Sequence, residues 1–73
     1  MLTLKVRVIL QWLHEDGWFL DRQPGTSHRQ FRHPAKPGIV TVNGKKSDDL
    51  FGGLLDSIAK QAGWTKDDVR TRQ

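Results

Sequence analysis

The sequence predicts a small α+β domain in which a helix, a three-stranded antiparallel sheet and a second helix follow one another. Two segments, 4–16 and 47–62, repeat apolar residues with the period of an amphipathic helix. Between them lie three short runs rich in β-branched and aromatic residues, separated by Pro and Gly turns. The 73 residues are enough for one domain, 1–73, and we expect its core within about 5–64.

The first helix is predicted over residues 4–16. Its apolar stripe has the spacing i, i+3, i+4 and i+7, and consists of Val6, Ile9, Leu10 and Leu13. Gly17 follows directly and suits a left-handed C-terminal cap. Val8 and Trp12 lie off this stripe, so they either flank the core or form an exposed patch that a partner protein covers.

Three strands are predicted next, over residues 18–22, 28–33 and 39–42. Pro24-Gly25 marks a turn after the first strand, residues 34–38 connect the second strand to the third, and Asn43-Gly44 ends the third. Because these connections are short, the strands should form an antiparallel meander.

Helical character returns over residues 47–62. Ser47 is the expected cap of a first turn, and the regular helix should begin near residue 53 because Gly52-Gly53 weakens the start. Thr65 and Asp68 resemble a capping box for a short terminal turn, and the tail over residues 70–73 should fray.

Both helices can cover one face of the sheet, which leaves the other face open to water. Side chains alternate along a strand, so neighbours in the second strand point to opposite faces. With Phe31 facing the helices, the open face should carry His28, Gln30 and Arg32.

Composition excludes several classes of protein. The chain has no cysteine, hence neither a disulfide framework nor a thiolate zinc site, which favours a reducing compartment. Apolar runs such as Val8-Ile9-Leu10 are too short to span a bilayer or form a signal-peptide core. We therefore expect a cytoplasmic protein with no membrane contact.

The charge is unevenly placed. The chain has twelve Lys or Arg and eight Asp or Glu, a net charge of +4. Segment 22–47 contains no acidic residue and six basic ones, Arg22, Arg29, Arg32, Lys36, Lys45 and Lys46. Such a segment is typical of a protein that binds a polyanion, although it could also be a solvated face that aids solubility.

An imidazole within this basic segment suggests RNA cleavage. The nucleophile in that reaction is the RNA's own 2′-hydroxyl, so the protein needs a group that moves a proton and cations that stabilise the phosphorane. His28 could move the proton; alternatively, it is a solvated loop histidine. Ser27-His28 has no acid nearby to complete a hydrolytic triad, and the three histidines lack metal-ligand spacing, so we expect neither a metal nor a cofactor.

A succession of motifs over about residues 5–64 resembles HicA-type toxins of bacterial toxin–antitoxin systems. The motifs are Asp16-Gly17-Trp18, Arg22-Gln23, GTSHRQF at 25–31, His33-Pro34, Lys36-Pro37-Gly38, Val40-Thr41-Val42, LLDSI at 54–58 and KQAG at 60–63. The resemblance implies a fold like that of double-stranded-RNA-binding domains. It also implies a metal-independent endoribonuclease that cleaves mRNA and a HicB-type antitoxin that inhibits it.

In that family the essential histidine lies in a Gly-Ser-His motif on the second strand, which is His28 here; Thr26 separates Gly25 from Ser27 in this chain. The candidate RNA-binding residues are Arg22, Ser27, Arg29, Gln30, Arg32, Lys36, Lys45 and Lys46. Two other functions stay open: a non-catalytic RNA-binding module of the same fold, and a protein-interaction domain that uses Val8 and Trp12.

Overall fold

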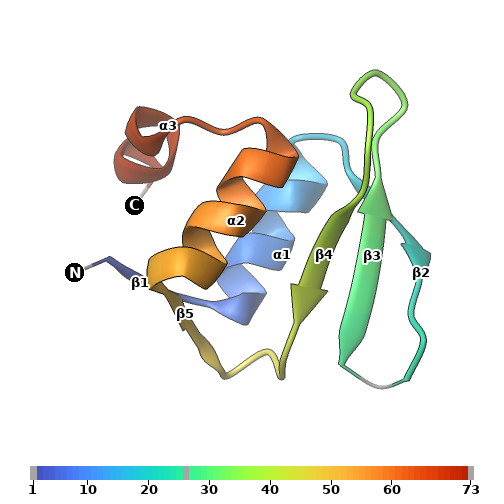
Figure 1. The fold of residues 1–73 in the computed structure, drawn as a ribbon, viewed down its shortest axis with the longest axis horizontal. Coiled ribbons are helices and arrows are strands. Elements are labelled where there is room, and N and C mark those ends of the chain that lie inside the picture. The colour runs from blue at the N-terminus through green and yellow to red at the C-terminus, as the bar shows by residue number, and fades with distance from the viewer. Residues whose placement is uncertain (1, 26, 73) are drawn as a thin grey trace.

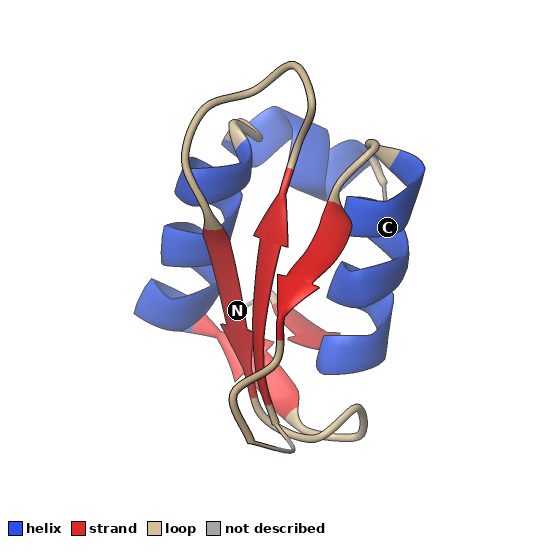
Figure 2. Ribbon diagram, turned by 90° about the vertical axis from the view of Figure 1, so that its right-hand side faces the viewer, coloured by secondary structure: helices blue, strands red, loops and turns tan. Residues whose placement is uncertain are grey.

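The computed structural model describes residues 2–25 and 27–72. The elements in chain order are β1 (Thr3–Lys5), α1 (Val6–Glu15), β2 (Phe19–Arg22), β3 (His28–Arg32), β4 (Val40–Asn43), β5 (Asp49–Phe51), α2 (Gly52–Ala62) and α3 (Lys66–Thr71). Strands β2, β3 and β4 form an antiparallel sheet in that order. The helices lie on one side of this sheet (Figures 1 and 2), so the predicted α+β fold is confirmed.

Helix α1 forms because its apolar stripe packs into the core, although Leu10 of that stripe is only partly buried. Val6, Ile9 and Leu13 have no exposed surface. The helix ends at Glu15 with Asp16 as its C-cap, and Gly17 follows with a φ of +95°, a conformation that other residues rarely adopt. A side chain at this position would also meet the ring of His33, since a Cβ there would lie 2.9 Å from His33 Nε2.

The start of α1 differs from the prediction because residues 3–5 form a strand. β1 pairs with β5 in a two-stranded sheet, in which Leu4 lies opposite Leu50 and both side chains are buried. The N–H groups of Val6 and Arg7 have no partner within their helix, and they donate to the carbonyl oxygens of Asp48 and Lys46. Backbone from a distant turn therefore caps the helix.

The same pairing overturns the prediction for residues 47–52. Residues 49–51 form a strand instead of a first helical turn. Ser47 does not cap α2; the N-cap is Phe51, which makes no side-chain cap hydrogen bond. The physical reason is that pairing with β1 buries Leu50 in the core.

Alternation in β3 follows the prediction. Phe31 is buried and pairs with Leu20 of β2 and Val40 of β4. His28 and Arg32 are exposed, and Gln30 between them is half-buried. The face of the sheet turned away from the helices therefore carries His28, Gln30 and Arg32, and we call it the open face.

The C-terminal segment packs onto the domain. Thr65 and Asp68 form the predicted capping box, in which each side chain accepts from the other residue's backbone N–H. The prediction that residues 70–73 fray is wrong for the described residues: α3 continues to Thr71, and the Arg72 guanidinium lies 5.6 Å from the ring centre of Trp12.

Trp12 belongs to the core and is not an exposed patch. Only 7% of its surface is exposed, and the ring of Trp64 packs edge-on against it with the two ring centres 6.0 Å apart. Val8 is partly buried against the same core. Trp12 is therefore part of the core and Val8 flanks it, and the alternative of a partner surface built on these two residues is wrong.

Candidate functional site

His28 and Asn43 form a hydrogen-bonded pair on the open face. His28 is the first residue of β3, and the antiparallel register places it directly opposite Asn43, the last residue of β4. The ring Nδ1 of His28 lies 2.9 Å from Oδ1 of Asn43, and both side chains are exposed. The imidazole is thus held by the sheet while it stays accessible to a large ligand.

Arg22 reaches the open face through a β-bulge. The register between β2 and β3 shifts between Leu20 and Arg22, so Asp21 is an extra residue and Arg22 lies opposite Gln30. Directly opposite residues share a face of the sheet. Arg22 and Gln30 therefore lie on the same face as His28.

Arg32 lies on the open face further along β3 and forms an exposed ion pair. Its Nε donates to Oδ2 of Asp21 at 3.1 Å, and about half of the Arg32 side chain is exposed. Such pairs contribute little to stability in water, about 0–1 kcal/mol. A phosphate can therefore compete with Asp21 for this guanidinium.

Arg29 lies on the helix-facing side of β3, away from His28. Its Nη1 donates to the carbonyl oxygen of Gly44 at 2.8 Å, and the side chain is half-buried. Gly44 N donates in turn to the carbonyl oxygen of Ser27, which extends the β3–β4 pairing. Arg29 thus stabilises the turn after β4 and positions Ser27 beside it.

Lys45 and Lys46 are exposed in this same turn. The turn is ordered by its own contacts: Lys45 N donates to Oδ2 of Asp48, and Asp48 N donates to the carbonyl oxygen of Lys45. The turn directly follows Asn43, the last residue of β4, which is paired with His28. The two lysines therefore lie near the His28 end of the sheet.

Lys36 is not brought to this cluster. Its Nζ donates to Oδ2 of Asp16 at 2.6 Å and to the carbonyl oxygen of Ala62 at 3.3 Å. These contacts tie the loop after β3 to the C-terminal ends of α1 and α2. The Lys36 side chain therefore forms a structural ion pair with Asp16, at the opposite end of the sheet from His28.

The partly buried carboxylate of Asp16 accepts hydrogen bonds from three side chains. Partial burial raises the pKa of its carboxyl, but hydrogen bonds from Lys36, Trp64 and Trp18 outweigh this effect, so the pKa lies below its ordinary value. A carboxyl that stays ionised in this way has a structural role, since its partners fix it within the fold.

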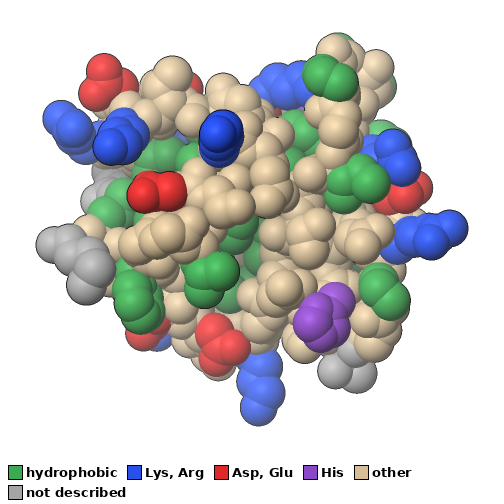
Figure 3. All heavy atoms as spheres, in the orientation of Figure 1, with side chains coloured by type: hydrophobic (Ala, Val, Ile, Leu, Met, Phe, Trp, Pro, Cys, Tyr) green, Lys and Arg blue, Asp and Glu red, His purple; other side chains and the backbone are tan. Residues whose placement is uncertain are grey.

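The cations do not merge into one patch on the face that Figure 3 shows. Lys and Arg side chains are scattered over that face, and at its right-hand edge they lie among exposed hydrophobic side chains. On β2, Phe19 and Leu20 are about half exposed, and Phe19 lies opposite Arg32. The open face therefore combines cations with an accessible aromatic ring.

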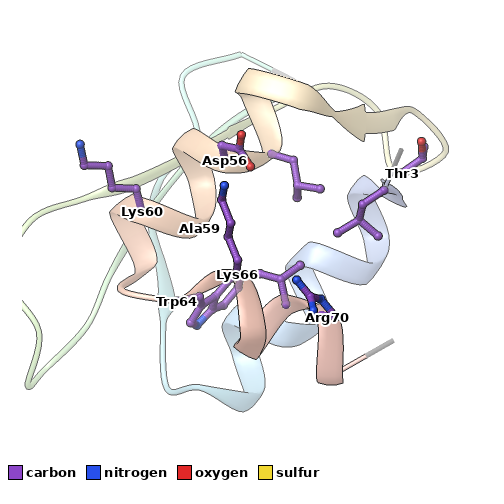
Figure 4. Close-up of a pocket in the computed structure, with 10 residues that line it drawn as sticks. Thr3, Asp56, Ala59, Lys60, Trp64, Lys66 and Arg70 are labelled. Carbon is purple, nitrogen blue, oxygen red and sulfur yellow. The ribbon is translucent and has the colours of Figure 1, made fainter.

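The larger of the two cavities lies away from the open face. A cavity of about 940 Å³ opens between α2, α3 and the N-terminal segment, and Leu55, Ala59, Trp64 and Val69 line its apolar part (Figure 4). A smaller groove of about 190 Å³ between β4 and α2 includes Asn43 and Thr41.

Among the described residues, no three His, Asp or Glu side chains gather as a metal site.

Asn43 is the site residue that sequence reasoning missed. Its sequence context, Asn43-Gly44 after a β-branched run, indicates only the end of a strand. The signal that identifies it is the antiparallel register with β3, which a linear pattern does not give. Thr26, the residue that separates Gly25 from Ser27, lies outside the described residues.

Comparisons with known proteins agree with the fold and the motifs. Within the described residues no helix has the length and apolarity to cross a membrane. A search of curated proteins returned no match. The family model described as the HicA toxin of bacterial toxin–antitoxin systems matches residues 6–64. Since that match covers most of the 73 residues, the chain belongs to the HicA toxin family.

Proposed function

We propose that this toxin is an endoribonuclease that cleaves mRNA, with His28 as the catalytic residue, and that a HicB-type antitoxin inhibits it. The observation that carries the proposal is the place of His28. Its imidazole is exposed on the open face, anchored to Asn43, with Arg22 on the same face. A site of this kind admits a polymer and holds a proton acceptor against it.

The chemistry requires few protein groups. Neutral His28 takes the proton of a 2′-hydroxyl, and the 2′-oxygen attacks the adjacent phosphorus. The bond from phosphorus to the 5′-oxygen breaks, and the leaving oxygen takes the proton from the imidazolium, either directly or through a water molecule that passes it on. The products are a 2′,3′-cyclic phosphate and a free 5′-hydroxyl, and the imidazole is neutral again at the end of the cycle.

Cations supply the second requirement, since charge accumulates on the phosphorane oxygens. Arg22 and Arg32 lie on the open face, and Lys45 and Lys46 lie in the turn beside it. With Ser27 and Gln30 they form our proposed RNA-binding set. Arg29 and Lys36, also expected from sequence, are better explained by their hydrogen bonds to Gly44 and Asp16.

No step in this scheme passes through a metal ion, so cleavage should persist in excess EDTA. The substrate also suggests a cytoplasmic place of action, where mRNA is found. Inhibition would follow if the antitoxin covers the open face, because RNA then cannot reach His28.

The test compares His28→Ala with His14→Ala. Both histidines are exposed, but His14 lies on α1, away from the open face. We expect His28→Ala to lower the cleavage rate of single-stranded RNA by about 100-fold or more, with RNA binding retained. His14→Ala should cleave at the wild-type rate. Circular dichroism spectra would establish that both variants fold.

Two results would contradict the proposal. Cleavage at the wild-type rate by folded His28→Ala would remove His28 from the mechanism. Wild-type protein that binds RNA but leaves it intact, when free of antitoxin, would favour the non-catalytic RNA-binding module instead.

A further inference from the structure

We infer that Asn43 is a positioning residue that fixes the tautomer of His28, so that Nε2 is the ring atom that takes the proton from RNA. The inference rests on the function proposed above. It goes further by assigning a role to a second side chain and by choosing between the two nitrogens of the ring.

The hydrogen bond itself sets the tautomer. The Oδ1 atom of Asn43 has only lone pairs, so it accepts, and the Nδ1 of His28 at 2.9 Å must donate to it. A neutral imidazole carries one hydrogen on its two nitrogens. With that hydrogen on Nδ1, the lone pair is on Nε2. A proton acceptor is thereby present at one defined atom.

The fold fixes this geometry from two sides. His28 and Asn43 are cross-strand partners in the register of β3 and β4, and the neighbouring pair Arg29 and Val42 continues the same ladder. Gly25 lies beside the ring, since a Cβ there would be 3.8 Å from Cδ2 of His28. Paired backbone therefore places the two residues directly opposite each other, and the hydrogen bond needs no reorganisation of a loop.

The hydrogen bond between His28 and Asn43 can form with both the neutral and the protonated ring. Nδ1 carries a hydrogen in the imidazolium as well, so the bond to Asn43 persists after Nε2 takes a proton. It is then charge-assisted and stronger. Asn43 thus stabilises the charged ring that forms during reaction more than the neutral ring before it. Such an interaction raises kcat and leaves KM nearly unchanged.

The charged groups around His28 do not replace this contact. Those on the adjacent elements are Asp21 and Arg22 of β2, Arg29 and Arg32 of β3, and Lys45, Lys46 and Asp48 after β4. Arg32 pairs with Asp21, and Arg29 donates to a backbone carbonyl. Within residues 2–25 and 27–72, no ion pair involves His28. The neutral amide of Asn43 is therefore what orients the ring.

The experiment uses two near-isosteric variants of the full chain, Asn43→Leu and Asn43→Asp. Leu removes the acceptor and keeps the branching at Cγ, whereas Asp keeps an acceptor and adds a charge. Gln11→Leu, a polar-to-apolar change at an exposed position of α1, is the matched control. Nitrogen-15 NMR of the histidine rings reports which nitrogen of His28 carries the hydrogen, and His28→Ala identifies its signals.

We expect Nδ1–H to dominate in wild-type protein and in Gln11→Leu, and Nε2–H to dominate in Asn43→Leu. In RNA cleavage, Asn43→Leu should lower kcat roughly three- to tenfold with KM nearly constant. Asn43→Asp should retain the Nδ1–H form. A carboxylate favours the imidazolium. On the acid side of the pH–rate profile, the Asn43→Asp variant should therefore lose activity at a higher pH than the wild-type protein does.

A folded Asn43→Leu variant that keeps the Nδ1–H form and the wild-type kcat would overturn this inference. So would an Asn43→Asp variant with an unmoved pH–rate profile. Failure of the proposed function would look different: His28→Ala would remain active, whereas the tautomer measured by NMR does not depend on catalysis.

Discussion

Asp16 accepts a hydrogen bond from the indole of Trp64, which lies 48 residues further along the chain, with Oδ2 and Nε1 3.2 Å apart. The same carboxylate oxygen accepts from Nε1 of Trp18 and from Nζ of Lys36. One carboxylate therefore joins the end of α1 to the start of β2, to the loop after β3 and to the segment between α2 and α3.

We predict that Asp16→Asn lowers the free energy of unfolding by about 1–3 kcal/mol. Asparagine keeps one acceptor oxygen but loses the charge that attracts Lys36, and it cannot serve all three donors equally well. Urea unfolding followed by tryptophan fluorescence measures the change. Asp56→Asn, at an exposed position of α2, is the control and should stay within about 0.5 kcal/mol of wild type. Equal stability of Asp16→Asn and wild type would show that the network contributes nothing.

The stability of the wild-type protein should fall in acid because of this carboxylate. Although burial raises the pKa of Asp16, hydrogen bonds from Lys36 and the two indoles bring it below the ordinary 3.8. A carboxyl with a depressed pKa in the folded state stabilises that state fully above its unfolded pKa. The contribution is lost as the pH falls from about 4 through the folded pKa.

The measurement is urea unfolding of wild type and Asp16→Asn between pH 7 and pH 2.5. The stability difference should be constant above pH 5 and should shrink below about pH 4. Asp68 also has a lowered pKa, from hydrogen bonds donated by Thr65, so Asp68→Asn separates its part of the acid effect. A difference between wild type and Asp16→Asn that is independent of pH would contradict the role of ionised Asp16.

The sequence predicted the elements with strong periodicity and, in the strand β3, the face that each side chain occupies. Phe31 points to the helices and His28 to the open face because alternation in a strand is a local property. Strand β5 was missed because pairing with β1, far away in the chain, overrides the local preference around Leu50. The contact between His28 and Asn43 depends on the register across the loop 33–39, which no local pattern specifies.

Lys36→Met should affect stability and leave RNA binding unchanged, although the charge pattern placed Lys36 among the RNA contacts. Its Nζ is 2.6 Å from Asp16 Oδ2 and the pair is only partly exposed, so we expect a loss of about 1–2 kcal/mol. Binding is measured by fluorescence anisotropy of a labelled single-stranded RNA, with His28→Ala in the background to prevent cleavage. A clear drop in RNA affinity at a temperature where the variant is folded would return Lys36 to the RNA-binding set.

Arg32→Met should give the opposite result. The ion pair with Asp21 is exposed, so its loss should change the free energy of unfolding by less than about 0.5 kcal/mol. Because Arg32 lies on the open face, its loss should weaken RNA binding roughly three- to tenfold in the same His28→Ala background. Losing one phosphate contact should also reduce the slope of log affinity against log salt concentration by about 0.7. An unchanged slope together with an unchanged Kd would mean that RNA does not displace Asp21 from Arg32, and the path of the RNA would then have to run nearer to Arg22 and the turn after β4.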